Sequence, residues 1–281
     1  MSHITQPFDY YVVLDFEATC DDRDPPQPQE VIEYPSVLLC GRTFEIIDEF
    51  SSFVRPTHHP KLTPFCMELT GISQAEVDSA PPFLDVYQQH IAWLRSHDLR
   101  VTLDDQGHSF SFIIGGDWDF RSMLPEQFSA TDPPVDFVPH AFRRWINIKP
   151  IYAAMKGKSK GPGMAGMLRG LGLDLVGRHH RGIDDSRNIA RIVQTLAERG
   201  ARLDTTTELS PSRYPQLTIK LRRDDDTREI TLKRRAIKTL QGIASSVYHW
   251  QIDHIFDPQG IELTDDAQLF DLRNGMELTI G

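Results

Sequence analysis

The sequence is poor in three features that would indicate other classes of protein. It has 3 cysteines in 281 residues, Cys20, Cys40 and Cys66, which are too few for a disulfide framework and lack the spacing of a zinc site. No apolar run is long enough to cross a bilayer, and residues 1–20 lack the basic and apolar segments of a signal peptide. Positive charge is also scarce, with 30 Lys and Arg against 40 Asp and Glu and a formal net charge of −10. We therefore expect an intracellular protein, cytoplasmic or nuclear, with no membrane partner.

The scarcity of positive charge argues at first against a nucleic-acid partner, but the charge is unevenly distributed. Residues 1–142 hold 7 basic and 23 acidic side chains, a net charge of −16. Residues 143–202 hold 13 basic and 4 acidic side chains, a net charge of +9. A basic block of this size is compatible with phosphate binding, although each single Lys or Arg in it is more readily explained as part of a solvated helix face.

Hydrophobic patterning predicts an α/β domain with a mixed sheet. Short β-branched and aromatic runs bounded by turn residues indicate strands at residues 10–16, 31–39, 43–54 and 110–114. The second and third of these strands are joined by Cys40-Gly41-Arg42, which is typical of an antiparallel hairpin. Apolar residues at helical spacing indicate helices at residues 82–97, 164–171 and 184–196.

The C-terminal part of the chain has its own pattern of elements. Residues 201–215 lack periodicity and contain two prolines, so we expect a linker there. After it, two strands with a charged turn, a helix and two short strands give the order β-β-α-β-β, which suffices for one small core. The expected domains are therefore residues 1–200 and residues 216–281.

Two acids stand close together at the end of the first predicted strand. Side chains alternate along a strand, so Asp15 and Glu17 project from one face while Leu14 and Phe16 take the other. Burying two unpaired carboxylates is costly, and a bound divalent cation removes that cost. Oxygen ligands alone favour Mg²⁺ or Mn²⁺. A pair of edge-strand acids that face water would explain the same pattern.

Further acids follow the fourth predicted strand and open the last predicted helix. Asp119 comes after Gly115-Gly116, at a strand end where α/β sheets place ligands, although it would also serve as a helix N-cap and Asp117 competes with it. Asp185 lies on the same helical stripe as the apolar residues Ile189 and Ile192 and therefore faces inward. A histidine just before that helix would reach the same site, although a lone histidine there is more often structural.

This ordered set of acids and a histidine resembles the DEDDh exonucleases of the RNase T-like superfamily, and most of all the branch that trims histone-mRNA 3′ ends and small RNAs. The motifs that carry the resemblance, all between residues 8 and 200, are residues 15–20, 32–35, 69–72, 118–119, 145–148 and 184–191. It implies an RNase H-like mixed sheet flanked by helices. It also implies a metal-dependent 3′→5′ exoribonuclease that hydrolyses the terminal phosphodiester of RNA and releases nucleoside 5′-monophosphates.

The same resemblance assigns roles to individual residues. The metal ligands, for two Mg²⁺ or Mn²⁺ ions, are Asp15, Glu17, Asp119 and Asp185, and Glu17 is also counted as catalytic. His180, and not His179, is the general base because it lies five positions before the last acid. The candidates for the pocket of the terminal nucleotide are Phe16, Ala18, Trp118 and Phe120, of which Trp118 is the preferred stacking residue. The residues expected to follow the RNA backbone are Arg143, Arg144, Lys149, Lys156, Lys158 and Lys160.

Other interpretations remain open at this point. Single-stranded DNA is an alternative substrate, because no residue pattern reads a 2′-hydroxyl. The C-terminal element order resembles ubiquitin-like β-grasp modules, which implies a protein partner. The chain ends at Gly281 without an extended di-glycine tail, so docking is expected and conjugation is not. An adaptor with an inactive nuclease domain would also fit this module, but all five expected active-site positions are occupied.

Overall fold

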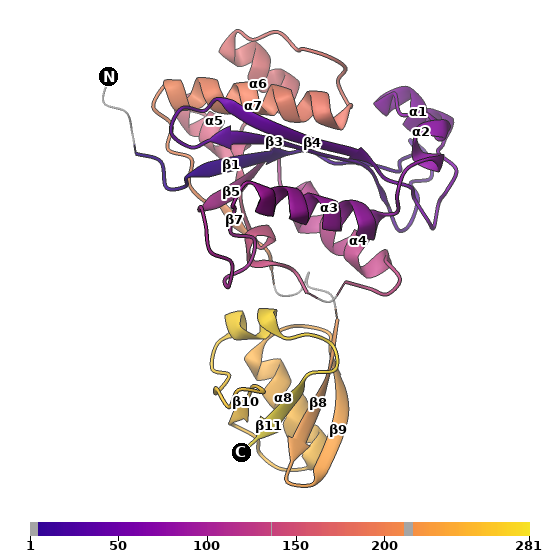
Figure 1. Ribbon diagram of the computed structural model, residues 1–281, viewed down its shortest axis with the longest axis vertical. Coiled ribbons are helices and arrows are strands. Elements are labelled where there is room, and N and C mark those ends of the chain that lie inside the picture. Colours follow the sequence, from indigo (N-terminus) through magenta and orange to yellow (C-terminus); the bar gives the residue numbers. More distant parts are fainter. Residues whose placement is uncertain (1–4, 136, 211–215) are drawn as a thin grey trace. The chain divides into compact units, whose positions relative to one another are not determined.

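The structure is a computed structural model that describes residues 5–135, 137–210 and 216–281 (Figure 1). It divides into two units, the first formed by residues 1–127 and 139–208 and the second by residues 128–138 and 209–281. None of the helices in the described part of the chain combines the length and apolarity needed to cross a membrane.

A seven-stranded mixed sheet forms the centre of the first unit. Its order is β2-β3-β1-β5-β6-β7, and β4 also pairs with β3. The strands are β1 (Tyr10–Leu14), β2 (Glu17–Ala18), β3 (Val31–Cys40), β4 (Ile46–Phe53), β5 (Phe110–Ile114), β6 (Arg144–Asn147) and β7 (Thr207–Glu208). β1 runs antiparallel to β3 and parallel to β5, and β5 runs parallel to β6. β3 and β4 are antiparallel, which confirms the predicted hairpin.

The central strands are apolar without alternation because helices cover both faces of the sheet. Figure 1 shows α5, α6 and α7 on one face and α3 and α4 on the other. The helices of this unit are α1 (Pro64–Thr70), α2 (Gln74–Asp78), α3 (Phe83–Ser96), α4 (Leu124–Ala130), α5 (Ile148–Met155), α6 (Met164–Leu171) and α7 (Gly182–Glu198), with short turns η1 (Asp119–Met123) and η2 (His140–Phe142). On β5, Ile113 belongs to the core shared with α7, whereas Phe112 packs 6.2 Å from the ring of His90 on α3.

The expected linker is wrong for residues 201–208, which are part of the first unit. Ala201 and Leu203 are buried in its core, and the Tyr11 hydroxyl donates to the Leu203 carbonyl at 3.0 Å. β7 then pairs antiparallel with β6. Two buried side chains and one short edge strand hold this segment, and neither produces a periodic pattern. Residues 209 and 210 of the expected linker are assigned to the second unit, and residues 211–215 lie outside the described residues.

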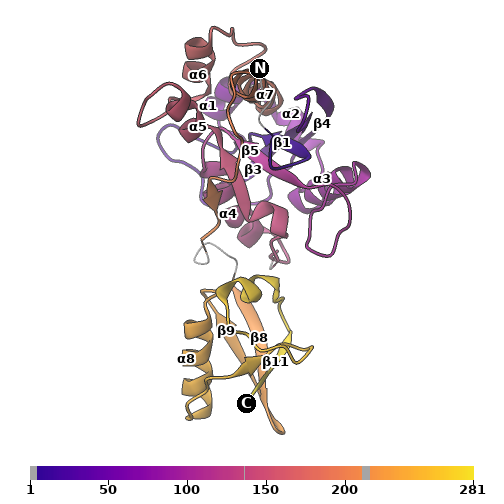
Figure 2. The same cartoon turned by 90° about the vertical axis from the view of Figure 1, so that its left-hand side faces the viewer.

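The second unit has the predicted β-β-α-β-β order. Its elements are β8 (Leu217–Arg223), β9 (Asp226–Leu232), α8 (Ile237–Tyr248), β10 (Ile255–Phe256), the turn η4 (Asp266–Asp271) and β11 (Glu277–Ile280). The sheet order is β10-β11-β8-β9, with β11 parallel to β8 and the other pairs antiparallel. Figure 2 shows α8 along one face of this sheet, where Leu240 and Ala244 join an apolar core.

Candidate active site

Asp15 and Glu17 lie where the chain leaves the centre of the sheet. The predicted strand at residues 10–16 ends at Leu14, and Glu17 begins the short strand β2. Carboxylate oxygens of Asp15 and Glu17 and one of Asp185 all lie within 4.8 Å of one another. The structure therefore brings together the first two acids of the motif with an acid about 170 residues further along the chain, at the carboxyl end of β1, where α/β sheets place ligands.

Asp119 joins these acids, and Asp117 does not. Asp119 is 5% exposed and its Oδ1 accepts the backbone N–H of Phe16 at 2.9 Å, between Asp15 and Glu17 in the chain. Asp117 instead accepts from the Trp145 indole at 2.9 Å and pairs with Arg121 at 3.2 Å. Asp117 thus ties β6 to η1, whereas Asp119 lies against the segment that carries Asp15 and Glu17. We refer to Asp15, Glu17, Asp119 and Asp185 as the carboxylate cluster.

Both histidines that precede α7 lie beside Asp185. The His179 Nδ1 is 2.9 Å from Asp185 Oδ2, and the backbone N–H of His180 donates to the same oxygen at 2.9 Å. The two rings stack 3.9 Å apart. His180 takes a left-handed backbone conformation with φ of 65°, which turns the chain into α7. The ring in contact with the acid is thus that of His179, which the resemblance sets aside.

Glu33 is a further buried acid of the site, and no role was predicted for it. It lies on β3 opposite Glu17 in the register. Its carboxylate accepts the backbone N–H groups of Gly182 at 2.9 Å and Ile183 at 3.2 Å, at the N-terminus of α7. A carboxylate is stabilised there by unpaired N–H groups and by the helix dipole. An acid within the apolar run 31–39 is the sequence signal that would have found it.

The acids of the carboxylate cluster are buried where their charged forms are disfavoured. Burial, and then the charge of Asp15, raises the pKa of Glu17 to about 10, and burial raises the pKa of Asp119 to about 6. Burial, followed by the charges of Asp119 and Asp185, also raises the pKa of Asp15 well above its usual range. Among the described residues, the buried Oδ1 of Asp185 has no hydrogen-bond partner. Hard oxygen ligands with an orphaned buried acceptor fit a divalent cation.

The predicted nucleotide pocket is only partly exposed. Trp118 is 43% exposed, whereas Phe16 and Ala18 are 4% and 7% exposed. Phe16 packs edge-on against Tyr34 at 4.7 Å. Phe120 is fully buried, with its ring 4.9 Å from that of Phe112, so its assignment to the pocket is wrong. The aromatic residues of the core surround Phe120, and that packing cannot be read from the sequence around it.

The predicted backbone-tracking residues also differ in exposure. Arg143 is 7% exposed, so the structure does not place it on the surface as expected. Arg144 pairs with Glu208 at 2.8 Å, and the Lys156 ammonium donates to the Gly170 carbonyl at 2.7 Å. Lys158 and Lys160 are exposed.

Two arginines dock the histidine loop onto α1 and α2. Arg178 donates to the Glu68 carbonyl, and its guanidinium fills the space beside Gly71. Arg181 donates to the Gly71 carbonyl at 3.3 Å and pairs with Glu76 at 3.3 Å. Gly71 ends α1 with φ of 71°, and a Cβ there would lie 2.6 Å from Arg178 Nε. The position of the loop therefore depends on a residue without a side chain.

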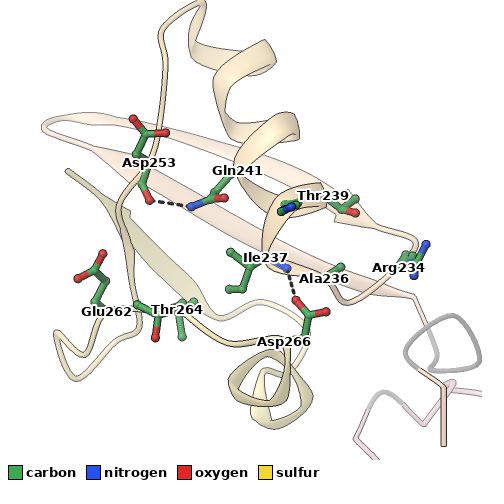
Figure 3. Close-up of a pocket in the computed structure, with 11 residues that line it drawn as sticks. Arg234, Ala236, Ile237, Thr239, Gln241, Asp253, Glu262, Thr264 and Asp266 are labelled. Carbon is green, nitrogen blue, oxygen red and sulfur yellow. Dashed lines mark hydrogen bonds between the residues drawn. The ribbon is translucent and has the colours of Figure 1, made fainter.

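A separate pocket of about 620 Å³ belongs to the second unit (Figure 3). Two hydrogen bonds organise it, from the Ile237 N–H to Asp266 Oδ1 at 2.8 Å and from Gln241 Nε2 to the Asp253 carbonyl at 2.7 Å. Its charged lining residues are of both signs: Arg234, Lys238, Asp253, Glu262 and Asp266. The carboxylate cluster lies outside this pocket and is the site that matches the predicted chemistry.

A mixed sheet covered by helices, with four acids converging beside its central strand, defines an α/β exonuclease of RNase H-like fold. The chain belongs to the RNase T exonuclease family, whose model matches residues 12–193. It is 46% identical over 198 residues to ERI1 exoribonuclease 3 of Homo sapiens, covering 69% of this chain and 56% of that protein. The chain thus spans little more than half the length of this relative.

Two solved structures are similar to the chain as well. One is the nuclease domain of 3′hExo, a DEDDh family member bound to rAMP, at 34% identity and a TM-score of 0.65, covering 73% of this chain and all of that one. The other is a 3′-exonuclease in 3′-end-specific recognition of histone mRNA stem-loop, at 31% identity and a TM-score of 0.66, covering 80% of this chain and 71% of that one. The predicted family is confirmed, and the family depends on divalent metal.

Proposed function

We propose that the chain is a metal-dependent 3′→5′ exoribonuclease that removes nucleoside 5′-monophosphates one at a time from RNA 3′ ends. The observation that carries the proposal is the convergence of carboxylate oxygens of Asp15, Glu17 and Asp185 within 4.8 Å of one another, beside Asp119 and the histidine loop. Burial raises the pKa values of all four acids, and the charges of neighbouring acids add to the rise for Asp15 and Glu17. The relatives support RNA as the substrate, because they are exoribonucleases and one neighbour holds rAMP.

The carboxylate cluster would hold two Mg²⁺ or Mn²⁺ ions. Bound divalent cations would neutralise the acids, acidify a water and stabilise charge on the reacting phosphate. Glu33 and the two loop arginines keep the first turn of α7 and the histidine loop in place, so that Asp185 and His180 keep their positions. Trp118, which is exposed beside Asp119, would stack on the terminal base, and Phe16 and Ala18 would line the base of that pocket.

His180 would accept the proton of the attacking water, as the family motif implies. Burial, and then the neighbouring His179, lowers the pKa of His180, which favours the neutral ring that a base requires. We expect His180→Ala to lower the single-turnover rate about 10²–10⁴-fold while RNA binding changes little. His179→Ala is the matched control, with a smaller expected loss. The assignment fails if His179→Ala causes the larger loss in single-turnover rate.

Matched RNA and DNA oligonucleotides, each incubated with Mg²⁺ and with EDTA, test the proposed function. The proposal predicts RNA shortening that requires Mg²⁺ and releases 5′-monophosphates. Preferential degradation of DNA would support the alternative of a single-stranded DNA exonuclease. Degradation of neither would leave an adaptor as the better description.

We also propose that residues 216–281 form a ubiquitin-like β-grasp module that docks a protein partner. The support is the sheet order β10-β11-β8-β9, with the parallel pair of β8 and β11 at its centre and α8 along one face. No catalytic role is assigned to this module, so its core should be separable from the chemistry in the destabilisation experiment described in the Discussion.

A further inference from the structure

Lys149 lies at the same end of the sheet as the carboxylate cluster. It is in the first turn of α5, where its backbone N–H donates to Asn147 Oδ1 at 3.0 Å. Asn147 ends β6 and is in register with Ile114, the last residue of β5. Gly116 and Lys149 therefore each follow a paired strand residue by two positions, at adjacent carboxyl ends of parallel strands.

The lysine side chain extends over the glycine turn toward the acids. A Cβ built at Gly116 would lie 3.1 Å from Lys149 Nζ and 3.8 Å from its Cε. A Cβ built at the adjacent Gly115 would lie 3.7 Å from Asp15 Oδ1. The Lys149 ammonium thus lies where a side chain at Gly116 would crowd it. The neighbouring residue, Gly115, is the one that faces Asp15.

Lys149 differs from its basic neighbours in how its ammonium is placed. The ammonium forms no hydrogen bond or ion pair with any residue that the structure describes, although the side chain is half-buried. It lies beside Gly116, and the adjacent Gly115 faces Asp15. Arg144 and Lys156, in the same basic segment, are held by Glu208 and by the Gly170 carbonyl.

Lys149 and the histidine loop lie beside different acids of the cluster. The histidine loop contacts Asp185, whereas the lysine extends over the glycine turn that faces Asp15. An in-line displacement places the attacking and departing oxygens on opposite sides of the phosphorus. A base and a cation at separate positions can therefore serve one oxygen each.

We propose that Lys149 is a further catalytic residue whose ammonium contacts the scissile phosphodiester on the side of the departing 3′-oxygen. The inference rests on the proposed function. The water oxygen forms a bond to phosphorus and gives its proton to His180 as the bond from phosphorus to the 3′-oxygen breaks. The departing oxygen keeps the electron pair and takes a proton from solvent, while Lys149 donates a hydrogen bond that stabilises its developing charge.

A purely structural role for Lys149 has different consequences. If the lysine only offset repulsion among the acids, its loss would change the stability of the metal-free protein and its affinity for metal. The rate would then fall for every substrate alike. A contact with the departing oxygen instead makes the loss depend on how much stabilisation that oxygen needs.

The test compares Lys149→Met and Lys149→Arg with Lys61→Met, an exposed lysine of the first unit that has no assigned role, as the control. Single-turnover trimming is measured on RNA and on the same RNA with sulfur in place of the scissile 3′-oxygen, because a departing thiolate needs less stabilisation. On unmodified RNA, we expect Lys149→Met to be about 10²–10³-fold slower and Lys149→Arg less impaired. The defect of Lys149→Met should shrink to about tenfold or less on the sulfur substrate, and Lys61→Met should match the wild type.

Thermal unfolding in EDTA and during a Mn²⁺ titration accompanies the rates. If Lys149→Met trims RNA at the wild-type rate, the inference about Lys149 is overturned while the proposed function stands. An equal loss of rate on both substrates has the same consequence. A loss that follows a weakened response to Mn²⁺ also overturns the inference. An inactive wild-type chain overturns the proposed function and this inference with it. Gly116→Ala, whose Cβ would crowd the ammonium, should show a smaller loss with the same dependence on the departing atom.

Discussion

The two units differ in how they bury charge. In the first unit, Glu17, Asp119 and Asp185 are buried facing one another, and Asp185 Oδ1 has no partner among the described residues. In the described part of the second unit, the charged side chain that is buried is Arg235, whose Nη1 donates to the carbonyls of Leu269 at 3.1 Å and Leu272 at 2.8 Å. The second unit thus gives its buried guanidinium two backbone acceptors, whereas the first buries several acids against one another.

Another buried acid of the first unit is supplied with hydrogen-bond donors, unlike Asp185 Oδ1 in the carboxylate cluster. Glu30 is buried in the same unit, yet its carboxylate accepts the backbone N–H groups of Thr57 at 2.6 Å and His59 at 2.7 Å. The sheet around it is therefore able to satisfy a buried acid with backbone donors. Buried acids left without such donors cost stability in the absence of a cation and are characteristic of functional sites.

The largest effect is expected when one acid of the carboxylate cluster is replaced. Asp185→Asn should lower Mg²⁺-dependent trimming at least about a thousandfold, because metal stabilisation of the transition state contributes several kcal/mol. The unfolding temperature in EDTA should stay the same or rise, since a repelling charge is removed. Trimming rates and thermal unfolding in EDTA measure the two effects. Asp174→Asn, at an exposed acid on the preceding loop, is the control, and near-normal trimming by Asp185→Asn would contradict the site.

The next effect concerns the second unit alone. Leu240 is fully buried in its core, so Leu240→Ala should lower the free energy of unfolding of that unit by about 2–5 kcal/mol. Trimming of RNA should remain at the wild-type rate, because no residue of the carboxylate cluster lies in this core. Denaturant unfolding followed by hydrogen exchange measures the first effect. A proportionate loss of trimming under conditions where the first unit stays folded would show that the two units are not separable in this way.

A smaller effect tests the docking of the histidine loop. Gly71→Ala should cost about 1–3 kcal/mol, because an alanine is strained at φ of 71° and its Cβ would meet Arg178. Gly172 has a similar φ of 79° but open space around its Cβ position. Gly172→Ala therefore measures the effect of backbone strain without a contact such as the one with Arg178. Trimming should fall further in Gly71→Ala than in Gly172→Ala. Equal rates in the two variants would argue against a role for the arginine contact in positioning the loop.

The smallest effect is a pH dependence that originates away from the cluster. Burial lowers the pKa of His90 to about 3, and its Nε2 lies 2.9 Å from the Ser36 hydroxyl. The unfolded chain takes up a proton near pH 6.5 that the folded protein does not, so stability falls as the pH drops below 6.5 toward 3. The loss at pH 5.5 should be about 1.4 kcal/mol. Unfolding measured from pH 7 to 5.5 should fall less steeply for His90→Gln, and an unchanged slope would contradict the assignment.

Local patterns were sufficient to predict much of the fold, whereas the members of the carboxylate cluster were predicted from the resemblance to the exonuclease family. β5 and α6 have the predicted bounds, because buried strands and amphipathic helices leave a periodic trace in the residues that form them. The resemblance selected Asp119 over Asp117 because the third acid of the family pattern directly follows an aromatic residue, here Trp118, and the structure shows the hydrogen bonds that hold Asp117 elsewhere.

Contacts between distant segments could not be predicted in the same way. The burial of Phe120 depends on neighbours from several elements, and Glu33 meets the N-terminus of α7 about 150 residues further along the chain. The segment at residues 201–208 is held by buried Leu203 and a two-residue strand, which are too short to show a period. The proximity of Lys149 to Gly116 likewise depends on the parallel register of β5 and β6.

The most direct test of the central claim follows a 5′-end-labelled RNA incubated with the wild-type chain and with Asp15→Ala, with Mg²⁺ and with EDTA. Our account predicts that the wild type with Mg²⁺ produces a ladder shortened stepwise from the 3′ end together with free nucleoside 5′-monophosphates. It predicts no shortening with EDTA and none by a folded Asp15→Ala chain. Equal trimming by Asp15→Ala, or trimming that continues in EDTA, would contradict the assignment of the carboxylate cluster as the metal site.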